Sequence, residues 1–303
     1  MTIRIGVVGF GSAGKQHIHA LNEMEEVDLA CVLEKNLDID LGGISRASSW
    51  QELLSDTAID AIALCIPPGT KGELAKQAII AGKSVLLEKP PCKNLDELCI
   101  LRDLAENNGV TIGVMFQHRY IIPTEVLSWK WNEKTTAILE VSRPRKTSRY
   151  FNDWRANPKQ ALGGIFAHLG VHYIDLACYI LGTPITHHQV GKREFVPGID
   201  MRVVGTIEFD TGAALAYIVT SEAEAQNERL TIFSDNKKIT IENGHLFLEY
   251  GGKSIQISPK SKHQLRQQVY LDFTKSILNG RQPVVCHLEG ARGITMLIQS
   301  LVK

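Results

Sequence analysis

Residues 3–14 hold the feature that most constrains the fold, an apolar run that passes directly into a glycine-rich turn. The run Ile3–Val8 is rich in isoleucine and valine, which is typical of a buried parallel strand. Gly9, Gly11 and Gly14 follow with the spacing G-x-G-x-x-G, and apolar residues then recur at helical intervals over residues 17–24. Such glycines permit a tight turn, close approach of a pyrophosphate to the backbone, and close packing of helix on strand. The N-terminus of the helix would also favour a bound diphosphate.

The context of this turn favours a dinucleotide site over an ordinary tight strand-to-helix turn, which is the alternative. A second apolar strand is predicted over residues 27–33, and Glu34 follows it, 34 − 14 = 20 residues after Gly14. An acidic residue at this distance can bind a ribose 2′-hydroxyl. Its carboxylate would repel a 2′-phosphate, so we expect NAD as the cofactor, although Lys35 leaves NADP possible.

The bulk composition excludes several classes of protein. The 303 residues suffice for two domains, and 33 basic residues balance 33 acidic ones at a pI near 7.1. We therefore expect neither nucleic acid nor an anionic membrane surface as a partner. No apolar run approaches the roughly 20 residues of a membrane span. Because the predicted strand begins at residue 3, we expect no signal peptide. Six scattered cysteines without C-x-x-C pairs indicate reduced thiols. We expect a cytoplasmic protein.

The alternation of elements predicts the fold class, an α/β chain in two domains. Strands predicted over 60–66, 84–87 and 111–115 alternate with helices, which indicates a doubly wound parallel sheet and an NAD(P)-binding domain over residues 1–120. Beyond it, a helix over 164–181 precedes strand-like runs at 202–209, 213–219, 229–234, 238–242 and 245–249, and helices near 264–279 and 288–302 end the chain. Successive strands indicate a mostly antiparallel sheet, so residues 121–303 form an α+β domain for substrate binding and oligomerisation.

Two clusters could carry chemistry. Glu88, Lys89 and Pro90 follow a parallel strand at the edge where open α/β sheets bind ligands, although a surface lysine that ends a strand is the plain alternative. His168 and His172 lie four residues apart on one predicted helix face that also includes Asp175. A neutral imidazole suits proton transfer. A zinc site or a merely polar helix face are the alternatives, and Leu169 occupies the position where the zincin motif has Glu.

Three motifs occur in the order glycine-rich turn, Glu88-Lys89-Pro90 and the helix with His168, His172 and Asp175. In this order they resemble the Gfo/Idh/MocA oxidoreductases over nearly the whole chain. The resemblance implies NAD(P)-dependent hydride transfer at a secondary hydroxyl or ketone of a sugar, a nucleotide-sugar or a cyclitol. It implies that Lys89 is the catalytic lysine and His172 the acid/base, with Asp175 structural or orienting. His168 departs from the Asp that many members carry, and Lys71 stands where a histidine is common. His168 would share the proton or bind substrate.

Residues ahead of the double glycine Gly163-Gly164 favour one substrate class. The segment 154–159 loosely resembles the lead-in of nucleotide-sugar and 2-acetamido-uronate dehydrogenases, and Arg143, Arg145, Arg149 and Arg155 in or beside the loop 143–155 could bind a phosphate or carboxylate. A solvated basic face is the alternative for these arginines.

The expected site residues follow from these arguments. The cofactor set is Gly9, Phe10, Gly11, Ser12, Ala13, Gly14, Glu34, Cys65, Pro67, Glu88 and Lys89. The catalytic set is Lys89, His172 and His168, and the substrate set is Arg119, Trp154, Arg155, His168 and Asp175, with no metal. We expect a sugar-type substrate, which the resemblance places among nucleotide-sugars or sugar acids. We also expect a homodimer or homotetramer. A cyclitol or free-sugar dehydrogenase and a catalytically silent dinucleotide-binding protein are the alternatives.

Overall fold

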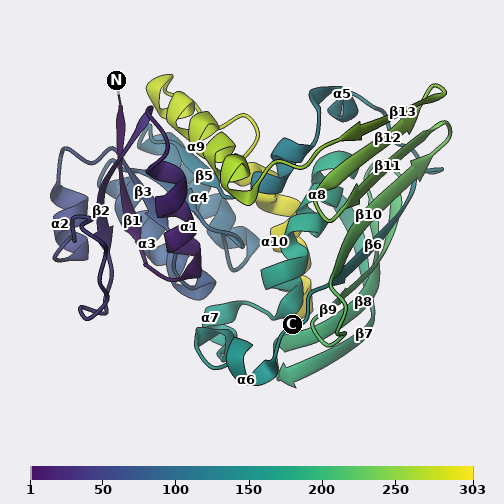
Figure 1. Ribbon diagram of the computed structural model, residues 1–303, viewed down its shortest axis with the longest axis horizontal. Coiled ribbons are helices and arrows are strands. Elements are labelled where there is room, and N and C mark those ends of the chain that lie inside the picture. The colour runs from purple at the N-terminus through teal and green to yellow at the C-terminus, as the bar shows by residue number, and fades with distance from the viewer. Residues whose placement is uncertain (1, 303) are drawn as a thin grey trace. The chain divides into compact units, whose positions relative to one another are not determined.

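The computed structural model describes residues 2–302, which divide into two compact units (Figure 1). The first unit comprises the chain up to Gln117 together with Ser261–Ala291, and the second comprises His118–Lys260 and the residues from Arg292 onward. Segment 261–291, which we call the return segment, was expected in the second domain but packs with the first unit. The two units therefore differ from the expected domains, which were divided once, after residue 120.

The first unit is built on a parallel sheet with strand order β2-β1-β3-β4-β5. The strands are β1 (Ile3–Val8), β2 (Val27–Leu33), β3 (Ala61–Leu64), β4 (Ser84–Leu87) and β5 (Ile112–Val114). Every residue of β3, β4 and β5 is buried, as the continuous apolar runs predict for a sheet covered on both faces. The predicted doubly wound sheet is confirmed.

Three of the five α-helices of the first unit begin at a capping side chain. The helices are α1 (Ser12–Leu21), α2 (Trp50–Ser55), α3 (Pro68–Ile80), α4 (Leu95–Asn107) and α9 (Lys262–Leu278), with the short 3-10 helix η4 (Leu288–Ala291). Ser49 caps α2, Asn94 caps α4, and Ser261 forms a capping box with Gln264 at the start of α9. Each cap satisfies a backbone N–H group that has no partner within its helix.

The return segment completes the open edge of the parallel sheet at β5. The backbone N–H of Val114 donates to the carbonyl of Cys286 at 2.8 Å, and that of Ile112 donates to Oε1 of Gln282 at 2.9 Å. The Thr111 hydroxyl donates to the carbonyl of Arg281 at 3.0 Å. These bonds explain why this late segment belongs to the first unit, since they satisfy edge groups that a sheet leaves unpaired.

The second unit carries an eight-stranded sheet of order β13-β12-β11-β10-β6-β9-β8-β7. The strands are β6 (Thr136–Ser142), β7 (Pro184–Val196), β8 (Ile199–Phe209), β9 (Ala214–Thr220), β10 (Asn227–Ser234), β11 (Lys237–Glu242), β12 (His245–Tyr250) and β13 (Lys253–Ile257). All neighbours are antiparallel except β6 and β9, which run parallel. The mostly antiparallel sheet is confirmed, whereas strands β7 and β13 were not predicted.

Helices of the second unit cover one face of this sheet and hold the predicted catalytic motif. They are η1 (Gln117–Ile121), which begins at the last residue of the first unit, α5 (Thr124–Leu127), α6 (Thr147–Tyr150), η2 (Trp154–Ala156), α7 (Pro158–Ala161), the π-helical turn η3 (Phe166–Gly170), α8 (Val171–Leu181) and α10 (Arg292–Val302). The predicted helix over 164–181 is thus divided into a π turn and α8, and the predicted loop over 143–155 contains short helices. A Cβ on Gly170 would approach a methyl carbon of Val219 to 2.9 Å, so the π turn packs closely on β9.

One helical run, Pro158–Leu181, is long and apolar enough to cross a membrane by length and composition alone. Its most apolar stretch is 89% buried inside the protein. The core helix of a globular domain shows the same burial, so the run carries no argument for a membrane span.

Candidate active site

The glycine loop of the first unit has one face closed by the protein and one face open. Gly9 has a φ of +95°, and a Cβ there would lie 2.7 Å from the carbonyl oxygen of Cys65. A Cβ on Gly14 would lie 1.9 Å from the carbonyl oxygen of Gly9, whereas a Cβ on Gly11 would meet nothing within 4 Å. Helix α1 starts directly after Gly11, and no side chain of the described residues caps it. The loop therefore fits the diphosphate of a dinucleotide, with Phe10, Ser12 and Ala13 beside its open face.

Glu34 lies at the end of β2 and contacts this loop directly. Its Oε2 accepts a hydrogen bond of 2.8 Å from the backbone N–H of Phe10, and its Oε1 accepts one of 3.0 Å from the N–H of Asn36. Arg46 donates to the carbonyl oxygens of Glu34 and Asn36, which holds the turn after β2. The carboxylate is thus fixed beside the glycine loop, where it fits the predicted role against a ribose hydroxyl and opposes a 2′-phosphate.

The two other cofactor residues predicted near β3 frame the same loop. The backbone N–H of Cys65 donates to the carbonyl of Val8 at 2.9 Å, and Pro67 precedes the first residue of α3. Burial raises the pKa of the Cys65 thiol well above its usual value, so it stays neutral. Cys65 therefore contributes its backbone carbonyl, which lies against Gly9, rather than a reactive thiolate.

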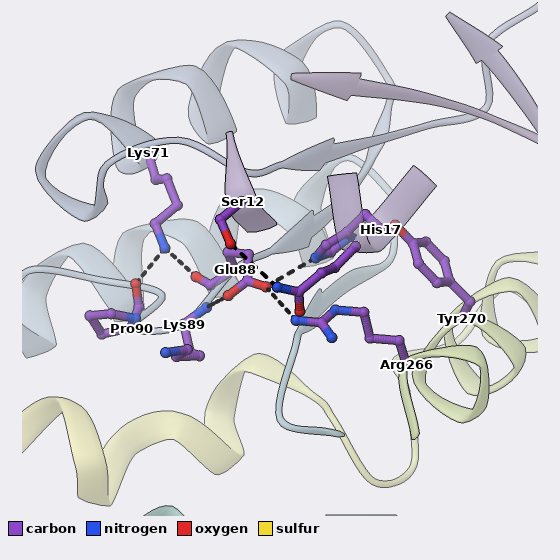
Figure 2. A network of polar contacts seen from close by, with 9 residues as sticks. Ser12, His17, Lys71, Glu88, Lys89, Pro90, Arg266 and Tyr270 are labelled. Atoms are coloured by element: carbon purple, nitrogen blue, oxygen red, sulfur yellow. Dashed lines mark hydrogen bonds and ion pairs between the residues drawn. The ribbon is translucent and has the colours of Figure 1, made fainter. Parts of the chain in front are cut away.

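Glu88 is the centre of a buried polar network in the first unit, which Figure 2 shows. Its Oε1 lies 3.1 Å from Nε2 of His17 and 3.8 Å from Nη2 of Arg266. The hydroxyl of Tyr270 lies 2.6 Å from Nδ1 of His17. Tyr270 and Arg266 belong to α9, so the return segment supplies half of this network.

The charges around Glu88 keep it ionised despite its burial. Burial alone raises the pKa of Glu88, but the hydrogen bond from His17 and the positive charges near the carboxylate, Arg266 and Lys89 among them, lower that pKa to about 2. Burial lowers the pKa of His17, while burial raises that of Tyr270. A neutral His17 that accepts from Tyr270 and donates from Nε2 to Glu88 satisfies both contacts.

Lys89 lies between two residues that the network holds in place. Its backbone N–H donates to Oε2 of Glu88 at 3.0 Å. The ammonium of Lys71, which is fully buried, donates to the carbonyl of Glu88 and, at 2.6 Å, to the carbonyl of Pro90 (Figure 2). Burial lowers the pKa of Lys71 to about 8. The backbone on both sides of Lys89 is thus fixed, and Lys89 alone of these three consecutive residues is not buried.

In the second unit, His172 lies in the first turn of α8 against another histidine that the sequence did not single out. The ring of His118 lies 4.2 Å from that of His172, with 35° between the ring planes, and 6.0 Å from the ring of Tyr173. His118 is in η1, directly before Arg119. Its place beside Arg119, which was predicted to bind substrate, was the only signal that could have found it.

Arg119 and Asp175 were predicted to bind substrate, but they bind each other. Nε and Nη2 of Arg119 donate to the two carboxylate oxygens of Asp175 at 2.9 and 2.6 Å, and both side chains are about 1% exposed. The guanidinium also lies over the ring of Tyr179, 4.8 Å from its centre. Burial raises the pKa of Asp175 although the charge of Arg119 opposes this. The pair fixes η1 against α8, which explains why His118 and His172 meet.

His168 lies in the π turn and contacts a different set of residues from His172. Its Nε2 lies 2.9 Å from the carbonyl oxygen of Ala161, and its ring centre lies 5.4 Å from Trp154 and 6.4 Å from Tyr150. The guanidinium of Arg155 stacks on these two aromatic rings. Trp154, Arg155 and His168 are thus brought together, as their place in one predicted substrate set requires.

The turn ahead of His168 depends on a buried carboxylate that the sequence did not single out. Asp200 accepts hydrogen bonds from the backbone N–H groups of Gly164 at 2.7 Å and Phe166 at 2.8 Å. A Cβ on Gly164 would lie 2.0 Å from the carbonyl oxygen of Asp200, which explains the glycine.

Within residues 2–302, neither His168 nor His172 belongs to a group of three side chains with metal-ligand spacing. The zinc alternative for these two histidines therefore has no third ligand in the described chain.

Comparison with known proteins decides the family. Residues 3–116 match the model described as an oxidoreductase family with an NAD-binding Rossmann fold, and residues 134–240 match the GFO/IDH/MocA C-terminal domain. The chain belongs to the Gfo/Idh/MocA family. This confirms the resemblance, the two-part fold and the expectation of an NAD(P)-dependent oxidoreductase.

Individual relatives span most of this Gfo/Idh/MocA chain. A scyllo-inositol 2-dehydrogenase (NAD(+)) of Bacillus subtilis (strain 168) is 26% identical over 95% of the chain and 90% of its own length. Levoglucosan dehydrogenase in complex with NADH superposes with a TM-score of 0.88 at 17% identity, covering 100% of this chain and 96% of its own. UDP-N-acetylglucosamine 3-dehydrogenase from Acidithiobacillus ferrooxidans gives 0.82 at 19% identity, covering 99% and 97%. At these identities the two structures establish the fold alone.

Proposed function

We propose that this Gfo/Idh/MocA protein transfers a hydride between NAD and a secondary hydroxyl or ketone of an uncharged cyclic polyol, either a sugar or a cyclitol. The observation that carries the proposal is the buried imidazole of His172 beside His118, held by the ion pair of Arg119 and Asp175. The inositol-type relative supports the substrate class. The position of Glu34 beside the glycine loop supports NAD.

The proposal assigns distinct roles to the two units. NAD, when bound to the first unit, supplies the hydride acceptor or donor in its nicotinamide ring. In the oxidation direction His172 accepts the hydroxyl proton, and the ammonium of Lys89 stabilises the negative charge that develops on that oxygen. His172 and Lys89 belong to different units, and their action on one substrate is part of the proposal.

The arginines near the predicted substrate loop favour an uncharged substrate. Arg143 forms a half-buried ion pair with Glu228, and Arg155 pairs with Asp153. Arg145 lies over the ring of Tyr150, 5.5 Å from its centre. These three cations already have partners within the second unit, so binding of a diphosphate by them would compete with those contacts. Arg149 is exposed and keeps the nucleotide-sugar candidate in the test.

Two other functions remain candidates, and the substrate panel described below distinguishes them. The predicted nucleotide-sugar or sugar-acid substrate is the second candidate, which the fold shared with a UDP-N-acetylglucosamine dehydrogenase supports. A catalytically silent dinucleotide-binding protein is the third. The predicted homodimer or homotetramer and the cytoplasmic location stay proposals, and sedimentation of the purified protein tests the first of them.

A panel of substrates tests the proposed function. The purified protein is incubated with NAD or NADP and with inositols, free sugars, glucosides, uronates or UDP-sugars, and the absorbance of reduced nicotinamide is followed. Turnover of an inositol, glucoside or free sugar supports the proposal, and turnover of UDP-sugars alone supports the second candidate.

His172→Ala should lower kcat at least about 1000-fold, the upper range for general acid–base catalysis, with unchanged NAD affinity. His188→Ala, which removes an exposed imidazole of β7, is the control. NAD binding without turnover on any compound would contradict the proposal.

A further inference from the structure

Three potential metal ligands that belong neither to the glycine loop nor to the Glu88 network meet on the first unit. His19 lies in α1, Glu23 comes four residues after His19 and two after the end of that helix, and His263 is the second residue of α9. The ligand atoms of the three side chains all lie within 4.8 Å of one another. The chain brings His263 to this place from 240 residues away, because α9 belongs to the first unit.

The distances within this cluster require little movement to hold an ion. Nε2 of His263 lies 2.6 Å from Oε2 of Glu23, and Nδ1 of His19 lies 3.8 Å from Oε1 of the same carboxylate. The two imidazole rings are 4.3 Å apart. Zinc binds His nitrogen and carboxylate oxygen at about 2.0–2.2 Å, which places tetrahedral ligand atoms roughly 3.3 Å apart. The observed separations lie on either side of that value.

The exposure of the three side chains supports an adjustable site with one fixed ligand. His263 is 19% exposed and is held by the start of α9, whereas His19 and Glu23 are 67% and 54% exposed. The exposed side chains can turn toward an ion at small cost. Two imidazoles and a carboxylate are the donor set that zinc shares with its neighbours among the transition metals, whereas calcium and magnesium prefer oxygen alone.

We propose that His19, Glu23 and His263 form a binding site for a divalent transition-metal ion, with zinc as the probe. Three protein ligands leave one position for water. The ion would join α1 to α9 and so fasten the return segment, which also carries Tyr270 and Arg266 of the Glu88 network. Its role is stabilisation of the first unit, separate from the hydride-transfer chemistry.

Calorimetry of the untagged, chelator-treated protein with zinc tests the site. We expect one equivalent of zinc to bind and magnesium not to bind, because imidazole nitrogen suits transition metals whereas magnesium prefers oxygen ligands. At a free zinc concentration about 100-fold above Kd, the folded state should be favoured about 100-fold, seen as a rise in Tm. Cobalt in place of zinc should give the visible absorption of a four- or five-coordinate ion.

Matched variants separate this site from other ligands in the chain. His263→Ala, Glu23→Gln and His19→Ala should each weaken zinc binding at least 10-fold and abolish the rise in Tm, while His188→Ala should bind as the wild type does. His172→Ala should also bind zinc normally, because His172 lies in the second unit. Stoichiometric binding that persists in His263→Ala, or no binding by the wild type at 100 μM zinc, would overturn the proposal.

Discussion

Replacement of Lys71 by methionine isolates the role of a buried ammonium in holding Lys89. Lys71 is fully buried and donates to the carbonyl oxygens of Glu88 and Pro90, on either side of Lys89. Methionine preserves most of the side-chain volume but removes both donors. We therefore expect Lys71→Met to release the backbone of the segment without opening a large cavity.

Two opposing contributions determine how Lys71→Met changes the free energy of unfolding. Burial lowers the pKa of Lys71 from 10.5 to about 8, which corresponds to about 3 kcal/mol against the charged form at neutral pH. The variant relieves this cost but leaves two buried carbonyl groups without their donor, at about 1–3 kcal/mol each. The free energy of unfolding of the variant should therefore lie between about 1 kcal/mol above and about 3 kcal/mol below that of the wild type. Misplacement of Lys89 should lower kcat about 10- to 100-fold.

The pH dependence of stability gives an independent check. Between the folded-state pKa of about 8 and the unfolded value of 10.5, the unfolded chain binds more protons at Lys71 than the folded chain does. The stability of the wild type relative to Lys71→Met should therefore rise with pH across this window and stay constant below it. Denaturant unfolding of both proteins at a series of pH values measures this difference.

Lys83 offers a matched control for the kinetics. It is a second buried lysine of the first unit whose ammonium donates to two carbonyls, those of Asp56 at 2.6 Å and Ile59 at 2.8 Å. Lys83→Met also removes the donor to two carbonyl groups of the first unit and should leave kcat unchanged. Equal losses of kcat in the Lys83 and Lys71 variants, or full activity in Lys71→Met, would refute the reasoning.

Three further changes test the cofactor and substrate regions. Glu34→Ser removes the carboxylate beside the glycine loop, so the ratio of kcat/KM for NADP to that for NAD should rise about 10- to 100-fold, and an unchanged ratio would contradict the assigned role. Gly11→Ala places a methyl group where no protein atom lies within 4 Å, so NAD affinity measured by fluorescence should fall at least 10-fold while Tm stays constant; equal NAD affinity would show that the diphosphate does not approach there. Asp200→Asn replaces an acceptor oxygen for the N–H groups of Gly164 and Phe166 by a donor, so the free energy of unfolding should fall by about 2 kcal/mol, and wild-type Tm would disprove this.

The elements that could be predicted are those whose determinants are local. The strand and glycine turn of Ile3–Val8 and Gly9 follow from apolar composition and from backbone geometry within a few residues. Strand β7 was missed because its 13 residues are mostly exposed and show no apolar alternation. Strand β13 was missed because it has only five residues and lies at the opposite edge of the sheet, so that Ile255 and Ile257 give only a short alternation. Edge strands carry a weaker pattern than central ones.

The candidate site was predictable in its motifs and not in its contacts. Lys89 and His172 were predicted from spacing and resemblance, and their catalytic roles stay predictions. His118 was missed because its contact with His172 depends on the ion pair of Arg119 and Asp175, which joins residues 56 positions apart. Both members of this pair were expected to bind substrate, but their side chains are buried against each other. Burial and pairing depend on tertiary packing, which a single sequence does not display.

The return segment has a consequence for the order in which the protein is made. During synthesis, all five strands of the parallel sheet leave the ribosome before Gln282, which lies 170 residues after the edge amide of Ile112 that it caps. While the residues of the whole eight-stranded sheet are translated, the edge of strand β5 therefore has no cap. Arg266, which contacts Glu88 in the finished protein, has not yet been made. Exposed edges of this kind invite pairing with other chains. Chaperone dependence and losses on truncation should therefore concentrate in chains that end before α9.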